Sequence, residues 1–132
     1  MSDATTAIYL AVALGGAAGG ALRHLVGAAV AARTGGRFPW GTWVVNVTGS
    51  ALIGLLVPVL GHAGPDGSPL AHALVVGLCG SYTTVSAFAL QSAELHRGGH
   101  HGTALLYAGG SVLACMVAVA AGYTLGLLWA TP

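Results

Sequence analysis

Four long apolar segments, almost free of charged residues, place the strongest constraint on what this chain can fold into. They cover residues 6–31, 39–60, 69–97 and 102–129, and each reaches the roughly 20 residues that a transmembrane helix needs. Only 5% of the residues are charged, compared with about 25% in soluble domains. Because lipid cannot satisfy backbone polar groups, such segments are expected to be helical. The sequence therefore predicts an all-α membrane protein with four transmembrane helices in a single domain over residues 1–132.

The arginines predict how the chain is oriented in the membrane. Arg33, Arg37 and Arg97 lie at the first and third connections, whereas the N-terminus and the middle connection carry only Asp3 and Asp66. Cytoplasmic connections are enriched in Lys and Arg. We therefore expect a multi-pass protein of the plasma (inner) membrane, with loops one and three cytoplasmic and both termini outside. The net charge of +1 leaves no basic surface for nucleic acid.

The third segment contains an unusually polar stretch. Residues 77–88 read GLCGSYTTVSAF, with two glycines and five hydroxyl side chains in the middle of a predicted membrane helix. Irregular backbone at this depth is tolerated only where it is buried in protein or lines a cavity. We therefore expect the third helix to be broken near its middle, around Gly80. Exposed carbonyls there suit a small cation. The hydroxyls of Thr83, Thr84 and Ser86 either hydrogen-bond to an anion or hydrogen-bond to one another.

Three other residues in the apolar segments each allow two interpretations. Arg23 either marks a functional site, as intramembrane charges do by default, or extends its charged end to the membrane surface. Asn46 either binds an ion through its amide or forms a hydrogen bond between helices. Phe88 either packs in the interior or turns its electropositive ring edge toward an anion.

Two spacing patterns concern the faces of the first and fourth helices. Gly15, Gly16, Gly19 and Gly20 either form a close packing face or reflect the general frequency of glycine in membrane helices. Tyr107, Ser111 and Cys115 are spaced four residues apart, which places them on one face of the fourth helix. They form a polar stripe in an otherwise apolar segment.

The sequence shows no arrangement that is typical of an enzyme. It has no nucleophile paired with a base, no paired carboxylates and no phosphate-binding loop. His96, His100 and His101 cluster at the third connection, but they do not form a closed set of zinc ligands with cysteine. Cys79 and Cys115 lie in separate apolar segments and are expected to be packed thiols.

Three motifs follow one another in the first three segments. They are Gly15-Gly16-x-x-Gly19-Gly20-x-x-Arg23, then Pro39-x-Gly41-Thr42-x-x-Val45-Asn46-x-x-Gly49-Ser50, then Gly77-x-Cys79-Gly80-x-x-Thr83-Thr84-x-Ser86-x-Phe88 with Glu94 after it. Each motif alone is weak. Their order and spacing within four membrane segments resemble the small four-helix fluoride channels of the Fluc (CrcB) family.

The resemblance implies a dimer and an ion path. It implies two antiparallel subunits with two pores along their interface, through which fluoride is exported passively. It also implies a structural sodium ion at the dimer centre, held by the backbone carbonyls of Gly80 and Thr83. The residues that it implies for the fluoride pathway are Asn46, Thr84, Val85, Ser86, Phe88, Tyr107 and Ser111, with Arg23 toward the vestibule.

One departure from the family pattern leaves the subunit composition of the channel undecided. The family reads Thr-Thr-Phe-Ser-Thr-Phe where this chain has Thr83-Thr84-Val85-Ser86-Ala87-Phe88, so Val85 offers no ring edge to an anion. The arginine bias is also unexpected for a chain that must insert in both orientations. The channel is therefore either a homodimer or a heterodimer with an oppositely oriented relative, in which this chain is inactive alone.

A small four-helix drug or cation transporter is a further alternative. Such proteins share the length, the helix number and the antiparallel pairing. They require a membrane-embedded carboxylate in the first helix, and the first segment has none, because Asp3 precedes it.

Overall fold

The computed structural model describes residues 2–36, 38–60 and 68–130, and all elements in these ranges are helical. The long helices are α1 (Asp3–Thr34), α2 (Trp40–Leu60) and α6 (His101–Ala130). The third span consists of α3 (Pro69–Ala71), the π-helix η1 (His72–Cys79), α4 (Gly80–Tyr82) and α5 (Val85–Arg97). Four spans are long and apolar enough to cross a membrane, which confirms the predicted all-helical, four-span chain. Arg37 and the middle connection with Asp66 lie outside the described residues.

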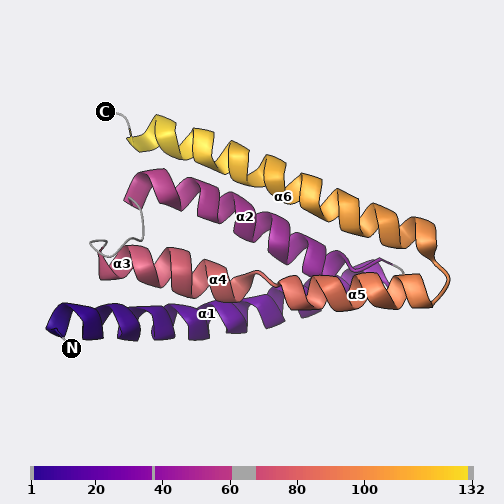
Figure 1. The fold of residues 1–132 in the computed structure, drawn as a ribbon, viewed down its shortest axis with the longest axis horizontal. Helices are drawn as coiled ribbons and strands as arrows, with labels where there is room; N and C mark the ends of the chain where they lie inside the picture. The colour runs from indigo at the N-terminus through magenta and orange to yellow at the C-terminus, as the bar shows by residue number, and fades with distance from the viewer. Residues whose placement is uncertain (1, 37, 61–67, 131–132) are drawn as a thin grey trace.

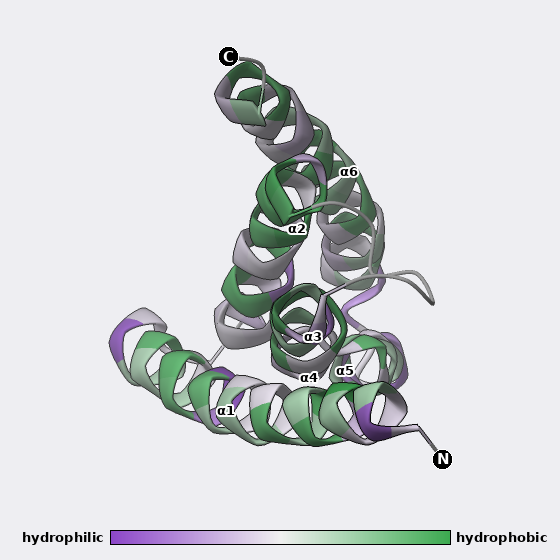
Figure 2. Ribbon diagram, turned by 90° about the vertical axis from the view of Figure 1, so that its left-hand side faces the viewer, coloured by the Kyte–Doolittle hydropathy of each residue, from purple (hydrophilic) through white to green (hydrophobic). Residues whose placement is uncertain are grey.

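The spans run alternately in opposite directions and form two pairs (Figure 1). α1 lies along the third span, and α2 lies along α6. The end of α1 and the turn between α5 and α6 are at one end of the molecule, and both chain termini are at the other. Hydrophobic residues predominate along α2 and α6 and along most of α1, whereas α5 mixes hydrophobic and hydrophilic residues (Figure 2). Apolar outer faces are expected for helices that contact lipid.

Glycines bring α1 into backbone contact with the third span. A Cβ atom added at Gly15 would collide with the carbonyl of Ala73, and one at Gly19 with the carbonyl of Leu78. From the third span, a Cβ added at Gly77 would lie 2.6 Å from the carbonyl oxygen of Val12 in α1. Gly15 and Gly19 therefore do form a close packing face, whereas a Cβ at Gly20 would have nothing within 4 Å.

Glycines also bring α2 into backbone contact with α6. A Cβ at Gly54 would collide with the carbonyl of Val119, and one at Gly122 with the carbonyl of Ala51. Between membrane helices there is little hydrophobic driving force, so association depends on close van der Waals packing at small residues. These glycines therefore set the distance between α2 and α6.

Two adjacent threonines separate α4 from α5. Thr83 (ψ 159°) and Thr84 (φ −150°, ψ 118°) are extended, whereas Gly80 is itself helical (φ −63°, ψ −34°). The amide and the hydroxyl of Thr83 both donate to the carbonyl of Cys79, at 3.0 Å each. The hydroxyl of Thr84 accepts from the amide of Ala87 at 3.2 Å and so caps the N-terminus of α5. The extended residues thus lie three and four positions beyond Gly80, because threonine side chains compete locally for helical hydrogen bonds.

Replacing Gly122 by alanine should lower the free energy of unfolding by about 1–3 kcal/mol, because the added methyl group forces α2 and α6 apart. Equilibrium unfolding of the detergent-solubilised protein with sodium dodecyl sulfate measures this change. Gly109→Ala is the matched control on the same helix, since its Cβ would have nothing within 4 Å. The control should stay within about 0.5 kcal/mol of the starting protein. Equal losses in the two variants would contradict the packing role of Gly122.

Candidate functional site

A groove of about 460 Å³ lies between α2, the extended threonines with the start of α5, and α6. We call it the central groove. It contains most of the residues that the sequence assigned to an ion path, and none of the described residues that line it is charged. The lining residues are Asn46, Ser50, Ile53, Thr83, Thr84, Val85, Phe88, Ser111, Val112, Cys115 and Met116.

Asn46 joins α2 to the extended backbone of Thr84. Its Nδ2 donates to the Thr84 carbonyl at 2.9 Å, and its Oδ1 accepts from the Thr84 amide at 2.7 Å. These two bonds fix the orientation of the side-chain amide. One of the two Nδ2 hydrogens remains for another acceptor in the groove. Asn46 therefore acts as a bridge between helices and can still donate to an anion.

Thr84 is buried, whereas the two residues that follow it are exposed. The Thr84 hydroxyl is buried and lies 3.1 Å from the hydroxyl of Ser86, which is exposed. Val85 is 79% exposed although it is apolar. The start of α5 is thus an uncovered edge of the central groove.

Ser111 is the most unusual polar residue of the groove. It is only 4% exposed, and its Oγ has no hydrogen-bond partner among the described residues. Buried polar groups in proteins are nearly always hydrogen-bonded, so an exception calls for an explanation. The hydroxyl is available to a ligand that enters the groove.

Tyr107 does not line the central groove, although it lies one helical turn before Ser111. Its side chain is fully buried, and its hydroxyl donates to Oε1 of Gln91 at 2.9 Å. Its ring packs against Phe88 and Phe38, with centroids 5.4 and 5.3 Å away. Tyr107 therefore supports the position of Phe88 at the groove wall.

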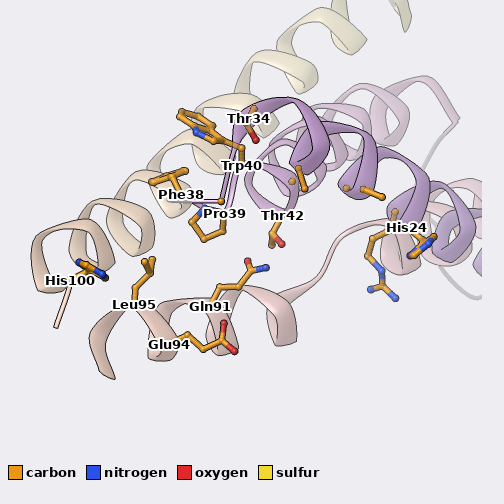
Figure 3. A pocket seen from close by; sticks show the side chains of 16 residues that line it. His24, Thr34, Phe38, Pro39, Trp40, Thr42, Gln91, Glu94, Leu95 and His100 are labelled. Atoms are coloured by element: carbon orange, nitrogen blue, oxygen red, sulfur yellow. The ribbon is translucent and has the colours of Figure 1, made fainter. Parts of the chain in front are cut away.

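A second hollow, which we call the end pocket, opens where α1 ends and α5 meets α6 (Figure 3). Its volume is about 660 Å³, and Arg23, Gln91, Glu94 and His100 are among its lining residues. Nη1 of Arg23 lies 3.4 Å from the carbonyl oxygen of Thr83, a residue that lines the central groove. The two hollows therefore approach each other at the extended threonines.

The carbonyls of Gly80 and Thr83 lack the amides that would pair with them in a continuous helix. The Thr84 amide, four residues after Gly80, donates to Asn46 instead. The Ala87 amide, four residues after Thr83, donates to the Thr84 hydroxyl. A Cβ at Gly80 would have nothing within 4 Å, so the space beside it is open. The Gly80 carbonyl oxygen is of the kind that can hold a sodium ion, whereas the Thr83 carbonyl accepts a hydrogen bond from Nη1 of Arg23 at 3.4 Å.

Comparison with known proteins identifies the family. Residues 10–123 match the model of the family described as CrcB-like protein, Camphor Resistance (CrcB). The chain belongs to this CrcB-like family. It is 46% identical over 118 residues to the Fluoride-specific ion channel FluC of Paracoccus denitrificans, covering 89% of this chain and 93% of the relative.

Two further relatives are similar over nearly their whole length. The Fluoride-specific ion channel FluC of Acidobacterium capsulatum is 44% identical over 119 residues, which cover 89% of this chain and 94% of the relative. The Fluoride-specific ion channel FluC 2 of Nitrobacter hamburgensis is 41% identical over 117 residues, again 89% of this chain and 94% of the relative. With its four apolar spans, this CrcB-like chain is a multi-pass membrane protein.

Sequence reasoning missed Gln91, which joins the end pocket of this CrcB-like fold to the buried hydroxyl of Tyr107. Gln91 lines the end pocket and fixes the hydroxyl of Tyr107. The available signal was its position three residues after Phe88, which places both on one face of α5. Of the residues assigned to the path, Asn46, Thr84, Val85, Phe88 and Ser111 meet in the central groove. Ser86 and Tyr107 border it, and Arg23 lies in the end pocket.

Replacing Asn46 by alanine should lower the free energy of unfolding by about 2–4 kcal/mol, because the buried amide and carbonyl of Thr84 both lose their partner. Sodium dodecyl sulfate titration in detergent measures the change.

Thr48→Val serves as the control for this prediction. Thr48 is exposed on the same helix and bonds to the Val44 carbonyl and to the Tyr82 hydroxyl. Its replacement should cost about 0.5–1 kcal/mol. If Asn46→Ala were no less stable than the control, the bridge to Thr84 would not be a significant support of the fold.

Proposed function

We propose that this chain is a subunit of a fluoride-selective channel that lets fluoride leave the cell passively. The names of its relatives support a fluoride channel. The observation that carries the proposal is the buried hydroxyl of Ser111, which has no hydrogen-bond partner within residues 2–36, 38–60 and 68–130, in a groove that no charged residue of these ranges lines. No catalytic role is proposed, since the relatives are named as ion channels and not as enzymes.

The central groove supplies the kind of groups that fluoride needs. Fluoride is small and holds its water tightly, so a path must offer hydrogen-bond donors that are already in place. The free Nδ2 hydrogen of Asn46, the hydroxyls of Ser111 and Ser86, and the ring edge of Phe88 are such groups. Since all are neutral, they bind an anion without trapping it, as conduction requires.

Arg23 is proposed to attract fluoride into the end pocket before the ion reaches the neutral donors of the central groove. The end pocket also contains the carboxylate of Glu94, so Arg23 attracts anions locally at its guanidinium and not through a net positive charge of the pocket. Its contact with the Thr83 carbonyl keeps the guanidinium beside the extended threonines. The path we propose therefore runs from the end pocket, past these threonines, into the central groove.

The membrane potential supplies the direction of transport. A negative interior drives an anion outward with about 2.3 kcal/mol per charge for each 100 mV. The arginines at the first and third connections support a cytoplasmic location for that end of the molecule, with both termini outside. In a subunit with this orientation the end pocket would be the cytoplasmic mouth, whereas an antiparallel partner would turn the same end outward. Export of fluoride would give resistance to it.

A second subunit in antiparallel orientation is proposed to cover the open side of the central groove. The exposure of Val85 and Ser86 supports this, because an ion path cannot remain open to lipid. Two subunits related in this way provide two pores. The carbonyls of Gly80 and Thr83 from both subunits would hold a sodium ion, which would supply a fixed positive charge that joins the subunits.

Two compositions of the dimer are compatible with this proposal. In a homodimer, Val85 is tolerated and each chain supplies the same groove. In a heterodimer, an oppositely oriented relative supplies donors that Val85 and Ala87 do not offer, and this chain alone is inactive. Chemical crosslinking of the singly expressed chain distinguishes them, since a stable antiparallel homodimer would contradict the second composition.

Liposomes that contain this chain alone should release loaded fluoride and retain chloride. A fluoride-selective electrode and a chloride electrode measure the two fluxes from matched liposomes. Selective efflux supports the homodimeric channel. If the folded chain is silent alone but conducts when coexpressed with a second homologue, the heterodimer is the working unit. Absence of flux from both compositions would refute the proposed function.

Replacing Ser111 by alanine should reduce fluoride efflux at least about tenfold while leaving the free energy of unfolding nearly unchanged. The hydroxyl has no partner to lose within the described chain, but it would be lost as a donor to the ion. Ser92→Ala is the control, because the Ser92 hydroxyl bonds to the Phe88 carbonyl of its own helix at 2.8 Å and does not line the groove. Full efflux in Ser111→Ala would exclude this hydroxyl from the path.

A further inference from the structure

The turn between α5 and α6 holds its backbone in one defined conformation. The amides of Gly98 and Gly99 donate to the carbonyls of Glu94 and His96, at 2.9 and 3.1 Å. The amide of His100 donates to the Leu95 carbonyl at 3.0 Å. Gly99 has a φ of 78°, a conformation that other residues rarely adopt. The last turn of α5 is therefore fixed against the first turn of α6.

This turn brings two imidazole rings together. Nδ1 of His96 lies 3.1 Å from Nδ1 of His101, and the ring centroids are 4.6 Å apart. Both side chains are exposed. One neutral ring donates its hydrogen to the other, so the acceptor nitrogen directs its lone pair at the nitrogen of its neighbour. When the donor ring changes tautomer, its hydrogen moves to its own Nε2, and both Nδ1 atoms then present a lone pair to the small region between the two rings.

The spacing of the two nitrogens suits a metal ion. Two metal–nitrogen bonds of about 2.0–2.1 Å place their nitrogens about 2.9 Å apart at a right angle and about 3.3–3.4 Å apart at the tetrahedral angle. The observed 3.1 Å lies between these values. We propose that His96 and His101 form a two-residue site for a late first-row divalent metal ion such as Ni²⁺, Cu²⁺ or Zn²⁺.

The surroundings make this an exchangeable site. No group of three or more His, Cys, Asp or Glu residues is arranged to hold a metal within the described part of the chain. Water must therefore complete the coordination, in contrast to closed structural zinc sites with four protein ligands. His100 belongs to the same turn but lines the end pocket (Figure 3). Arg97 precedes the turn, and its charge weakens the binding of any cation.

A bound ion would tie together the helices that carry Phe88 and Tyr107. His96 is in the last turn of α5, and His101 is the first residue of α6. An ion that binds only the folded chain also stabilises it by mass action. The site is thus a metal-dependent link at the end of the molecule where the end pocket opens, and it does not depend on the fluoride proposal.

Titration of tag-free, detergent-solubilised protein with Ni²⁺ tests the site, because Ni²⁺ does not oxidise the two free cysteines. Isothermal titration calorimetry should give one site per chain. His96→Gln and His101→Gln should each weaken binding at least about tenfold, and paramagnetic Ni²⁺ should broaden the ring resonances of these two histidines before those of His24. Added Ni²⁺ should also raise the Tm of the starting protein but not that of either variant.

His100→Gln is the matched control within the same turn and should keep the affinity within about threefold. All variants must retain the metal-free Tm of the starting protein, which separates lost binding from lost folding. Binding that is unchanged in His96→Gln and His101→Gln would overturn the proposal. An equal loss in His100→Gln, or no binding by the starting protein, would overturn it as well.

Discussion

The paired hydrogen bonds between Asn46 and Thr84 are the interaction on which the rest of the site depends. An extended residue at membrane depth leaves an amide and a carbonyl without helical partners, and lipid offers none. A single primary amide meets both needs, because it carries a donor and an acceptor side by side. The same bonds take the Thr84 amide away from the Gly80 carbonyl. One side chain thus stabilises the interruption and creates the free backbone oxygen beside it.

Close glycine contacts give this interruption rigid surroundings. α1 contacts the third span through Gly15 and Gly19, and α2 contacts α6 through Gly54 and Gly122. Since the membrane provides little hydrophobic force between helices, backbone contact of this kind determines which helices pair. The central groove lies where the two pairs meet. Its polar groups are therefore attached to closely packed backbones, and they can be in position before an ion arrives.

The positive charge of Arg23 and the neutral donors of the central groove lie in different places, so the residue that attracts an anion is not among those that line its path. Arg23, in the end pocket, approaches the carbonyl of Thr83, while every described residue that lines the groove beyond it is neutral. A charged group deep in a low-dielectric groove would hold an anion strongly, whereas neutral donors give weaker sites from which it can leave. The hydroxyl of Ser111, which has no partner in the described part of the chain, fits this division, because a donor already satisfied by the protein could not replace water around an ion.

The sequence by itself determined the four helices and most polar positions of the groove. Helices in lipid follow from length and hydropathy, which are local properties, and Asn46, Thr84 and Ser111 stand out because they interrupt apolar segments. Only the tertiary structure decided that the extended residues are Thr83 and Thr84, that Asn46 pairs with Thr84, and that Gln91 fixes Tyr107. Hydrogen bonds need a defined distance and direction between atoms. Those quantities arise only when helices distant in the sequence pack together, and no spacing along one chain specifies them.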